Sequence, residues 1–282
     1  MRVNIYAFAD EASSEIDKQI LSMKKNGIKG LEIRNVDGVN VSDISDSKAK
    51  EVRKKLDDAG LITWSIGSPI GKIDIEKNDF KLHVEKFKRT LEIAEILDCR
   101  NLRMFSFFIP KDKNPNEYKN EIIDRLGVFC DIAKETPVEL CHENEKGIYG
   151  DNAERCLEIL KQFPQIKGVF DPANFVQCKQ DTVEAWNMLG AYIKYVHIKD
   201  ALSDMSVVPA GKGEGNVEFI IDEYMKNGGK DFTIEPHLAV FDGFGDLEIN
   251  SEEKSRLIYS YSSNEEAFDA AVNAFKSIIE KK

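Results

Sequence analysis

The sequence predicts an α/β protein built as a single (β/α)8 TIM barrel, and three observations lead to that fold class. Short runs rich in β-branched and aromatic residues alternate with longer amphipathic stretches along the whole chain. The strand starts recur at intervals of roughly 25 to 40 residues. The chain has 282 residues, which suits eight such units closed into one barrel. We therefore expect residues 1–282 to form one domain.

Eight segments have the length and composition of strands in a parallel sheet. Each is short, rich in apolar residues and bounded by turn-forming residues. The first is followed by "FADEASSE", which has no glycine, so the Gly-rich turn of an open dinucleotide-binding sheet is missing. The predicted strands are 3–8, 30–35, 61–67, 100–107, 137–143, 166–171, 193–199 and 231–236.

The stretches between the strands carry apolar residues three or four positions apart, as the buried face of a helix does. Several begin at serine and end at glycine, which are common capping residues. The alternation as a whole predicts eight helices, and the clearest ranges are 13–27, 45–60, 83–98, 118–135, 151–163, 217–229 and 263–282. The connection before the last helix, at about 239–263, is unusually long, which is typical of lids, binding loops and oligomer contacts.

Composition narrows the function classes. The formal net charge is -11, which opposes binding to the phosphate backbone of nucleic acids. The first residues lack the pattern of a signal peptide, and no apolar run reaches the roughly 20 residues that span a bilayer. The five cysteines are odd in number and form no C-x-x-C pair, so we expect free thiols in a reducing cytosol. A cytoplasmic protein without membrane or nucleic-acid partners is the expectation.

The stretch "YVHIKDA" shows where chemistry is expected. In a barrel the reactive side chains lie at the carboxyl ends of the strands, and side chains alternate between the two faces of each strand. Val196 and Ile198 suit the outer face, which leaves His197 and Lys199 pointing inward. The same alternation turns the following residues inward on other strands: Glu32, Arg34, Glu139, Cys141, Glu143 and Glu235.

Four consecutive strands thus bring Glu143, Asp171, His197 and Glu235 to one rim. Three neighbouring carboxylates repel one another, and a divalent cation relieves that repulsion. A set of three carboxylates and one imidazole favours Mn²⁺ or Mg²⁺, with Co²⁺ and Zn²⁺ as further candidates. The other three histidines are expected outside the site. His142 faces the helices, His237 lies past its strand, and His83 suits a cap or surface position.

Several motifs also resemble those of a known family. "ELCHENEKGIYGD", "GVFDPANF", "YVHIKDA", "VPAGKGEG" and "FTIEPH" are similar to segments of the sugar isomerases and epimerases in the xylose isomerase-like barrel superfamily. The resemblance covers nearly the whole chain and implies a metal bound by the same four residues. It also implies that Glu143 and Glu235 move protons. Many relatives have a histidine that contacts substrate where this chain has Asn174, an amide that hydrogen-bonds but does not titrate near neutrality.

The chemistry expected from such a site is proton abstraction next to a carbonyl, through an enediolate. Return of the proton to the opposite face would be epimerisation, and return to the neighbouring carbon would be isomerisation. Basic residues near strand ends are candidates for binding the phosphate or carboxylate of a small sugar substrate, and they include Lys212 in "AGKGEG". The predicted substrate-binding residues are Glu32, Arg34, Lys72, Arg103, Asn174 and Lys199.

Three other functions are compatible with a barrel. A metal-dependent dehydratase or lyase acting on a polyol or a dehydroshikimate-like acid would use the same ligands. A non-catalytic sugar-binding barrel would need no base. An abasic-site endonuclease would need a zinc cluster rich in histidine, and four histidines with a net charge of -11 disfavour it. Related barrels often pair, so a homo-oligomer is also expected.

Overall fold

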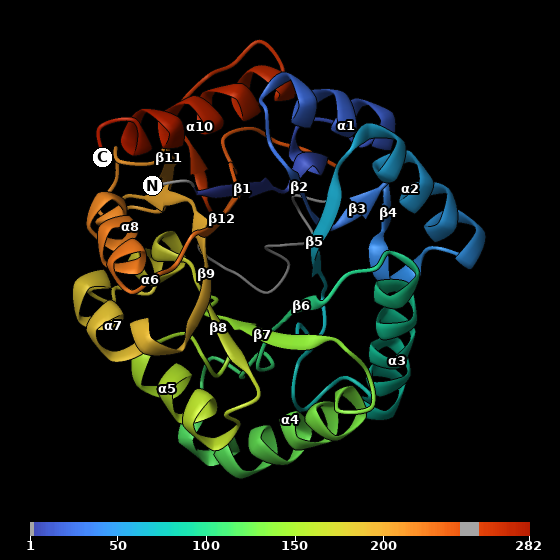
Figure 1. Cartoon of the computed structure of the whole chain (residues 1–282). Helices are drawn as coiled ribbons and strands as arrows, with labels where there is room; N and C mark the ends of the chain where they lie inside the picture. The colour runs from blue at the N-terminus through green and yellow to red at the C-terminus, as the bar shows by residue number, and fades with distance from the viewer. Residues whose placement is uncertain (1–2, 243–253) are drawn as a thin grey trace.

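The computed structural model describes residues 3–242 and 254–282. Eight parallel strands close into a barrel in the order β1-β12-β9-β8-β7-β6-β5-β2, and helices surround it (Figure 1). Each barrel strand lies within its predicted range, and the predicted fold class is confirmed. The barrel strands are β1 (Asn4–Ala7), β2 (Gly30–Ile33), β5 (Ile62–Gly67), β6 (Asn101–Met104), β7 (Glu139–Glu143), β8 (Lys167–Phe170), β9 (Ile193–Ile198) and β12 (Asp231–Ile234).

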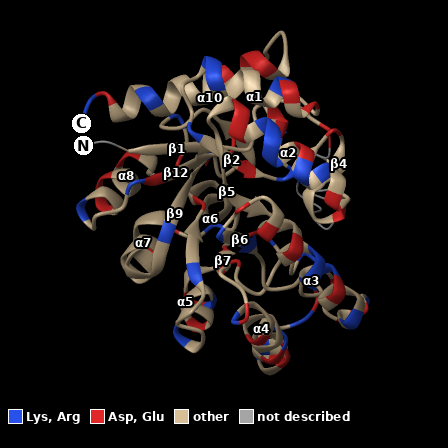
Figure 2. Cartoon of the chain, turned by 45° about the vertical axis from the view of Figure 1, so that its right-hand side comes forward, with Lys and Arg blue, Asp and Glu red and all other residues tan. Residues whose placement is uncertain are grey.

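The surrounding helices bury apolar residues against the barrel, and Figure 2 shows the many charged residues along α1 to α4. α2 has the predicted caps, because Ser45 accepts a hydrogen bond from the Lys48 N–H and Gly60 is left-handed at φ 69°. The helices are α1 (Ile16–Lys25), α2 (Asp46–Ala59), α3 (Phe80–Ile96), α4 (Lys119–Ala133), α5 (Ala153–Gln162), α6 (Pro172–Gln177), α7 (Thr182–Leu189), α8 (Val217–Lys226) and α10 (Asn264–Ile279).

Two helix details differ from the prediction. α3 begins at Phe80, three residues before the predicted start, because the Asp79 side chain caps it by accepting the Lys81 and Leu82 N–H groups. His83 is therefore inside the first turn and buried, where its Nε2 accepts the Gly71 N–H at 2.8 Å. The expected cap or surface position of His83 was wrong. The interval between β8 and β9 had no predicted helix range and contains α6 and α7.

Small sheets lie outside the barrel. β3 (Asn35–Val36) and β4 (Val39–Asn40) form a hairpin across Asp37 and Gly38, both with positive φ. A three-stranded sheet joins β10 (Asp200–Ala201), β11 (Ser206–Val208) and β13 (Arg256–Leu257). β13 belongs to the long connection predicted at 239–263, of which residues 243–253 lie outside the described part.

The structure also tests two expectations, on the cysteines and on membrane-spanning segments. The five cysteines are free thiols, as predicted. Within residues 3–242 and 254–282, no helix combines the length and the apolar character needed to cross a membrane.

Candidate metal centre

The four predicted ligands lie together at the carboxyl end of the barrel, which we call the mouth. Glu143 ends β7, Asp171 follows β8, His197 lies near the end of β9, and Glu235 follows β12. Adjacent parallel strands in register bring these ends to one level, with His197 paired to Thr233 and Glu143 to Val169. One ligand atom from each residue lies within 4.8 Å of the others, and all four residues are buried. We call this group the acid–histidine cluster.

His197 has a different partner on each ring nitrogen. Its Nδ1 faces the cluster, 3.0 Å from Glu143 Oε1, 3.7 Å from Glu235 Oε2 and 3.8 Å from Asp171 Oδ2. Its Nε2 lies 3.2 Å from Glu32 Oε2. Burial alone would lower the pKa of His197, but the Glu143 and Glu32 carboxylates raise it well above its usual range.

Glu32 contacts the side of the His197 ring that faces away from the acid–histidine cluster. It is fully buried, and Tyr195 donates its hydroxyl proton to Glu32 Oε1 at 2.8 Å. Ser65 donates to the same oxygen at 3.3 Å. Burial opposes ionisation of Glu32, but the charge and hydrogen bond of His197 lower its pKa. A carboxylate in this position commonly orients a metal-binding imidazole. The predicted substrate contact of Glu32 stays a prediction.

The donor atoms of the cluster fit a divalent cation. Glu143 Oε2 and Asp171 Oδ2 are buried oxygens that make no hydrogen bond, and each lies within 3.1 Å of a cationic side chain, Arg103 or Lys199. Two buried carboxylate oxygens on neighbouring strands that face positive groups indicate a place that favours a cation. Three carboxylates and one imidazole nitrogen form a ligand set used by Mg²⁺, Mn²⁺ and Zn²⁺ sites.

Lys199 adds an ammonium group to the cluster. Its Nζ lies 3.0 Å from Asp171 Oδ2 and 2.9 Å from Glu235 Oε2. Burial would lower the pKa of Lys199, but these two carboxylates raise it well above the usual range. Lys199 thus neutralises part of the acidic charge and stays positioned at the edge of the cluster.

Two arginines complete the charge network of the mouth. Arg34 donates to both Asp10 oxygens, at 2.8 and 3.0 Å, and its Nη2 lies 3.1 Å from Glu11 Oε1. Arg103 Nη1 lies 3.1 Å from Glu143 Oε2 and 3.7 Å from Glu235 Oε1.

Glu235 joins the two sides of this network because its oxygens have different partners. Oε2 faces Lys199, while Oε1 lies 3.3 Å from Arg34 Nη1. Burial would raise the pKa of Glu235, but Lys199 and the other nearby cations lower it well below its usual range. For Glu143 burial prevails over His197 and Arg103, and its pKa is raised.

The other predicted contact residues differ in their distance from the cluster. Asn174 Nδ2 lies 3.4 Å from Glu143 Oε1, and its N–H donates to Asp171 Oδ1 at 2.9 Å. Lys72 pairs with residues outside the cluster. Its Nζ lies 2.7 Å from Glu145 Oε2 and 4.4 Å from the centre of the Phe105 ring.

Sequence reasoning missed part of the site. Asp10 and Glu11 lie in a short 3-10 helix directly after β1, and both are buried. The acidic pair at a strand end was the available signal.

The expectation that His237 lies outside the site was also wrong. A positive φ of 45° turns it back, and its Nε2 lies 3.4 Å from Glu11 Oε1 and 3.6 Å from Glu235 Oε1.

His142 and Cys141 support the predicted orientation of β7. His142 lies 2.9 Å from Ser106 Oγ, away from the cluster, and burial lowers its pKa to about 3. Cys141, one residue earlier, packs inside the barrel against Tyr195 and Val169.

Burial raises the pKa of the Cys130 thiol to about 11, so a thiolate nucleophile there is disfavoured near neutrality.

The glycine-rich turn "AGKGEG" also has an internal partner. The buried Asp200 carboxylate accepts the N–H groups of Gly211, Gly213 and Gly215, each at 2.9 Å. Added side-chain carbons at Gly213 and Gly215 would lie 2.3 and 2.7 Å from Asp200 Oδ1. The glycines are therefore needed for the backbone to surround this carboxylate.

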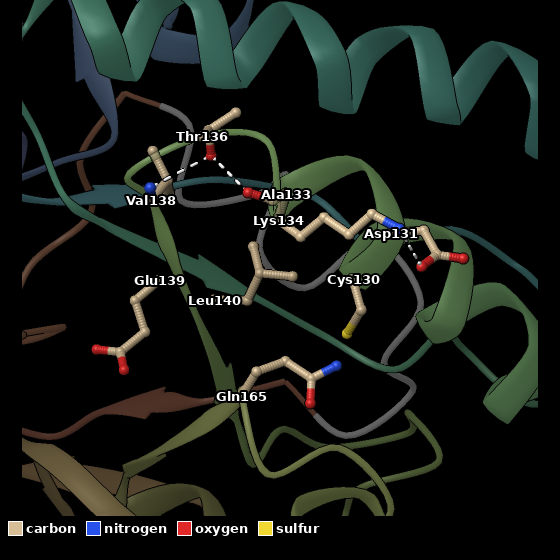
Figure 3. Close-up of a pocket in the computed structure, with 9 residues that line it drawn as sticks. All are labelled: Cys130, Asp131, Ala133, Lys134, Thr136, Val138, Glu139, Leu140 and Gln165. Atoms are coloured by element: carbon tan, nitrogen blue, oxygen red, sulfur yellow. Dashed lines mark hydrogen bonds and ion pairs between the residues drawn. The ribbon is translucent and has the colours of Figure 1, made fainter.

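A pocket at the other end of the barrel has no comparable chemistry. Figure 3 shows Thr136, Val138 and Glu139 at the start of β7, with Cys130 and Gln165 nearby. Thr136 donates its hydroxyl to the Ala133 carbonyl and accepts the Val138 N–H. This pocket shares no lining residue with the acid–histidine cluster, and it lies at the barrel end that usually serves stability.

The fold and the mouth together define a class of protein: a (β/α)8 barrel with a candidate metal site at the carboxyl ends of its strands. The chain belongs to the xylose isomerase-like TIM barrel family, whose model matches residues 21–250. This confirms the family that the sequence motifs resembled. No curated protein sequence matches the chain.

Solved structures show the same fold at low sequence identity. The IOLI protein with a bound zinc atom has a TM-score of 0.76 and 16% identity, covering 99% of this chain and 98% of its own. D-psicose 3-epimerase, solved in the presence of D-fructose, has a TM-score of 0.74 and 16% identity, covering 97% of each chain. The "probable 3-DHS dehydratase" of Bacillus anthracis has a TM-score of 0.68 and 18% identity, covering 88% of this chain and 96% of its own.

Proposed function

We propose that the protein is a divalent-metal-dependent isomerase or epimerase of a sugar, acting by proton abstraction next to a carbonyl. One observation carries the proposal: two glutamates, an aspartate and a histidine place ligand atoms within 4.8 Å of one another at the mouth of the barrel. The similarity to D-psicose 3-epimerase supports the reaction class. Mn²⁺ or Mg²⁺ suits the carboxylate-rich set, and Co²⁺ or Zn²⁺ is the alternative.

Glu143, Asp171, His197 and Glu235 would hold the cation. When bound, it would polarise the substrate carbonyl and stabilise the negative charge of an enediolate. Glu143 and Glu235 come from strands on different sides of β8 and β9, so a sugar carbon lying between them could lose a proton to one and regain it from the other. Arg103, within 3.7 Å of both glutamates, would keep the pair close while their protonation changes.

Lys199 and Asn174 are suited to hold substrate hydroxyls beside the reacting carbon. The ammonium of Lys199 offers three donors, of which Asp171 and Glu235 use two directions. The Asn174 amide faces Glu143, at the side where a carbon-bound proton would be exchanged. Both roles rest on proximity to the two proposed proton-transferring glutamates.

The test is exchange of a carbon-bound substrate proton in deuterated water, followed by NMR over a sugar panel with Mg²⁺. Glu143→Gln and Glu235→Gln should each lower the exchange rate by about 10²- to 10⁴-fold, the usual contribution of a general acid or base. Glu139→Gln is the matched control, because Glu139 begins the same strand and pairs with Lys194 at the other end of the barrel. Wild-type exchange rates in both active-site variants would remove the catalytic assignment.

A dehydratase acting on a dehydroshikimate-like acid is the second candidate, and the similar Bacillus anthracis structure favours including it. After proton abstraction its substrate would lose a hydroxyl group as water instead of regaining a proton. The same NMR panel with such an acid distinguishes the two reactions, because dehydration removes the substrate signals instead of replacing one proton by deuterium.

A further inference from the structure

Every basic side chain predicted to bind an anionic substrate group inside the mouth already has a carboxylate partner. Arg34 pairs with Asp10, Lys72 with Glu145, Arg103 with Glu143, and Lys199 with Glu235. The shortest distance in each pair is between 2.7 and 3.1 Å. Asp10 and Glu145 lie outside the proposed ligand set, so the pairs of Arg34 and Lys72 would remain when a cation is bound. At Arg103 and Lys199 a phosphate would compete with carboxylates that also hold the cation.

The charge balance of the network is negative. Four Lys or Arg side chains face seven carboxyl groups, a formal excess of three negative charges before His197 is counted. Burial raises the pKa of Glu11 to about 8, so this carboxyl is largely protonated near neutrality and two negative charges remain in excess. A bound divalent cation would offset these two charges without making the mouth positive. An added phosphate would therefore find no net positive charge in a buried, weakly screened site. The seven carboxylates belong to Asp10, Glu11, Glu32, Glu143, Glu145, Asp171 and Glu235.

Both arginines are also held by aromatic rings. The guanidinium of Arg34 lies 4.6 Å from the centre of the Phe8 ring and 4.7 Å from that of Phe241. The guanidinium of Arg103 lies 5.0 Å from Phe8 and 4.9 Å from Phe105. Turning either group toward a phosphate would break two cation–π contacts and a buried ion pair.

The turn predicted to bind an anion does not substitute for these cations. The glycine-rich turn that could bind an anion uses the N–H groups of Gly211, Gly213 and Gly215 to hold Asp200. Lys212 on that turn is exposed, and a single solvated lysine contributes little to binding an anion.

From these observations we infer that the substrate is an uncharged, unphosphorylated sugar. The inference rests on the proposed function and narrows it. Uncharged hydroxyls can accept hydrogen bonds from Lys199 and Asn174 without separating the ion pairs. The same mouth then selects against the phosphorylated form of the same sugar by charge.

The test compares affinities of matched pairs for the full-length protein loaded with Mg²⁺, by NMR titration at millimolar concentrations. The pairs are D-fructose with D-fructose 6-phosphate, and D-tagatose with D-tagatose 6-phosphate. We expect at least one uncharged sugar to bind at least about tenfold more tightly than its phosphate, because the mouth offers the phosphate group no net positive charge. Equal or tighter binding of the phosphates, or binding of neither member of both pairs, would overturn the inference.

A charge-releasing variant sharpens the test. Glu145→Gln removes the partner of Lys72 and should raise the affinity for the phosphorylated sugars about tenfold, while uncharged sugars change less than about twofold. The matched control is Glu158→Gln, which removes the partner of Lys119 on the outer helices and should change neither affinity. A wild-type phosphate affinity in a folded Glu145→Gln protein would show that paired lysines are not what excludes the anion.

Binding and proton exchange separate the two proposals. Tighter binding of uncharged sugars without exchange of any carbon-bound proton would refute the proposed isomerase chemistry and leave the charge selection standing. Exchange of protons on phosphorylated sugars only would support the proposed isomerase chemistry and refute the selection against charged substrates.

Discussion

Two layers inside the barrel differ sharply although they lie on the same strands. The lower layer, which we call the floor, consists of Trp64, Cys141, Val169 and Tyr195, which pack together. The upper layer is the acid–histidine cluster. Three of its members follow a floor residue by two positions: Glu143 follows Cys141, Asp171 follows Val169, and His197 follows Tyr195. The period of two that turns the floor inward therefore turns the ligands inward as well.

The comparison shows how a barrel can hold close negative charges. The floor is well packed: the Trp64 ring lies 5.7 Å from the Tyr195 ring and 4.3 Å, nearly parallel, from the Tyr6 ring. Such packing fixes the strands that carry the ligands. The upper layer instead depends on pairing with Lys199, Arg34 and Arg103. Tyr195 connects the two layers, because its ring belongs to the floor and its hydroxyl binds Glu32.

The largest expected effect comes from removing a ligand in the upper layer. Asp171→Asn keeps a side-chain oxygen for the cap of α6 but removes the charge, so Mn²⁺ affinity should fall by at least about 100-fold, the upper range for losing a supporting partner. Calorimetric titration measures it. Asp181→Asn is the matched control, because Asp181 caps α7 in the same way outside the mouth. Unchanged affinity in Asp171→Asn would exclude Asp171 as a ligand.

A smaller effect is expected from the carboxylate behind His197. Glu32→Gln should lower Mn²⁺ affinity by about 10- to 100-fold, because His197 loses the charge that orients its ring. The protein should remain folded, since glutamine fills the same volume. Calorimetry and the melting temperature in excess chelator are measured together. A full wild-type metal affinity would mean that the floor alone positions His197.

The smallest effect on the metal site is expected from the floor itself. Val169→Ala should lower the free energy of unfolding by about 1–2 kcal/mol through loss of packed methyl groups. Metal affinity should change less than about threefold, because Asp171 lies beyond the altered side chain. Denaturant unfolding and metal titration of the same sample check both. A fall in metal affinity comparable to that in Glu32→Gln would show that the floor and the acid–histidine cluster depend on each other.

The strand pattern was the part of the site that the sequence could predict. Glu143, Asp171, His197 and Glu235 lie at strand ends, where alternation and the parallel arrangement determine which way they face. Glu11 and His237 lie just beyond strands, in a 3-10 turn and at a positive φ, where alternation no longer applies. The expectation that Lys72 could meet a phosphate ignored Glu145, because loops after β5 and β7 bring the two together across 73 positions of the chain.

Phe8, the residue after β1, illustrates how much can depend on one apolar ring. It contacts both arginines, and its ring lies edge-on to His197 at 5.5 Å. Gly67 makes room for it, since an added side-chain carbon there would lie 2.6 Å from Phe8 Cε1. Positions 8 and 67 should therefore evolve as a pair. A lineage that shrinks the ring would remove a cation–π contact from Arg34 and from Arg103 at once.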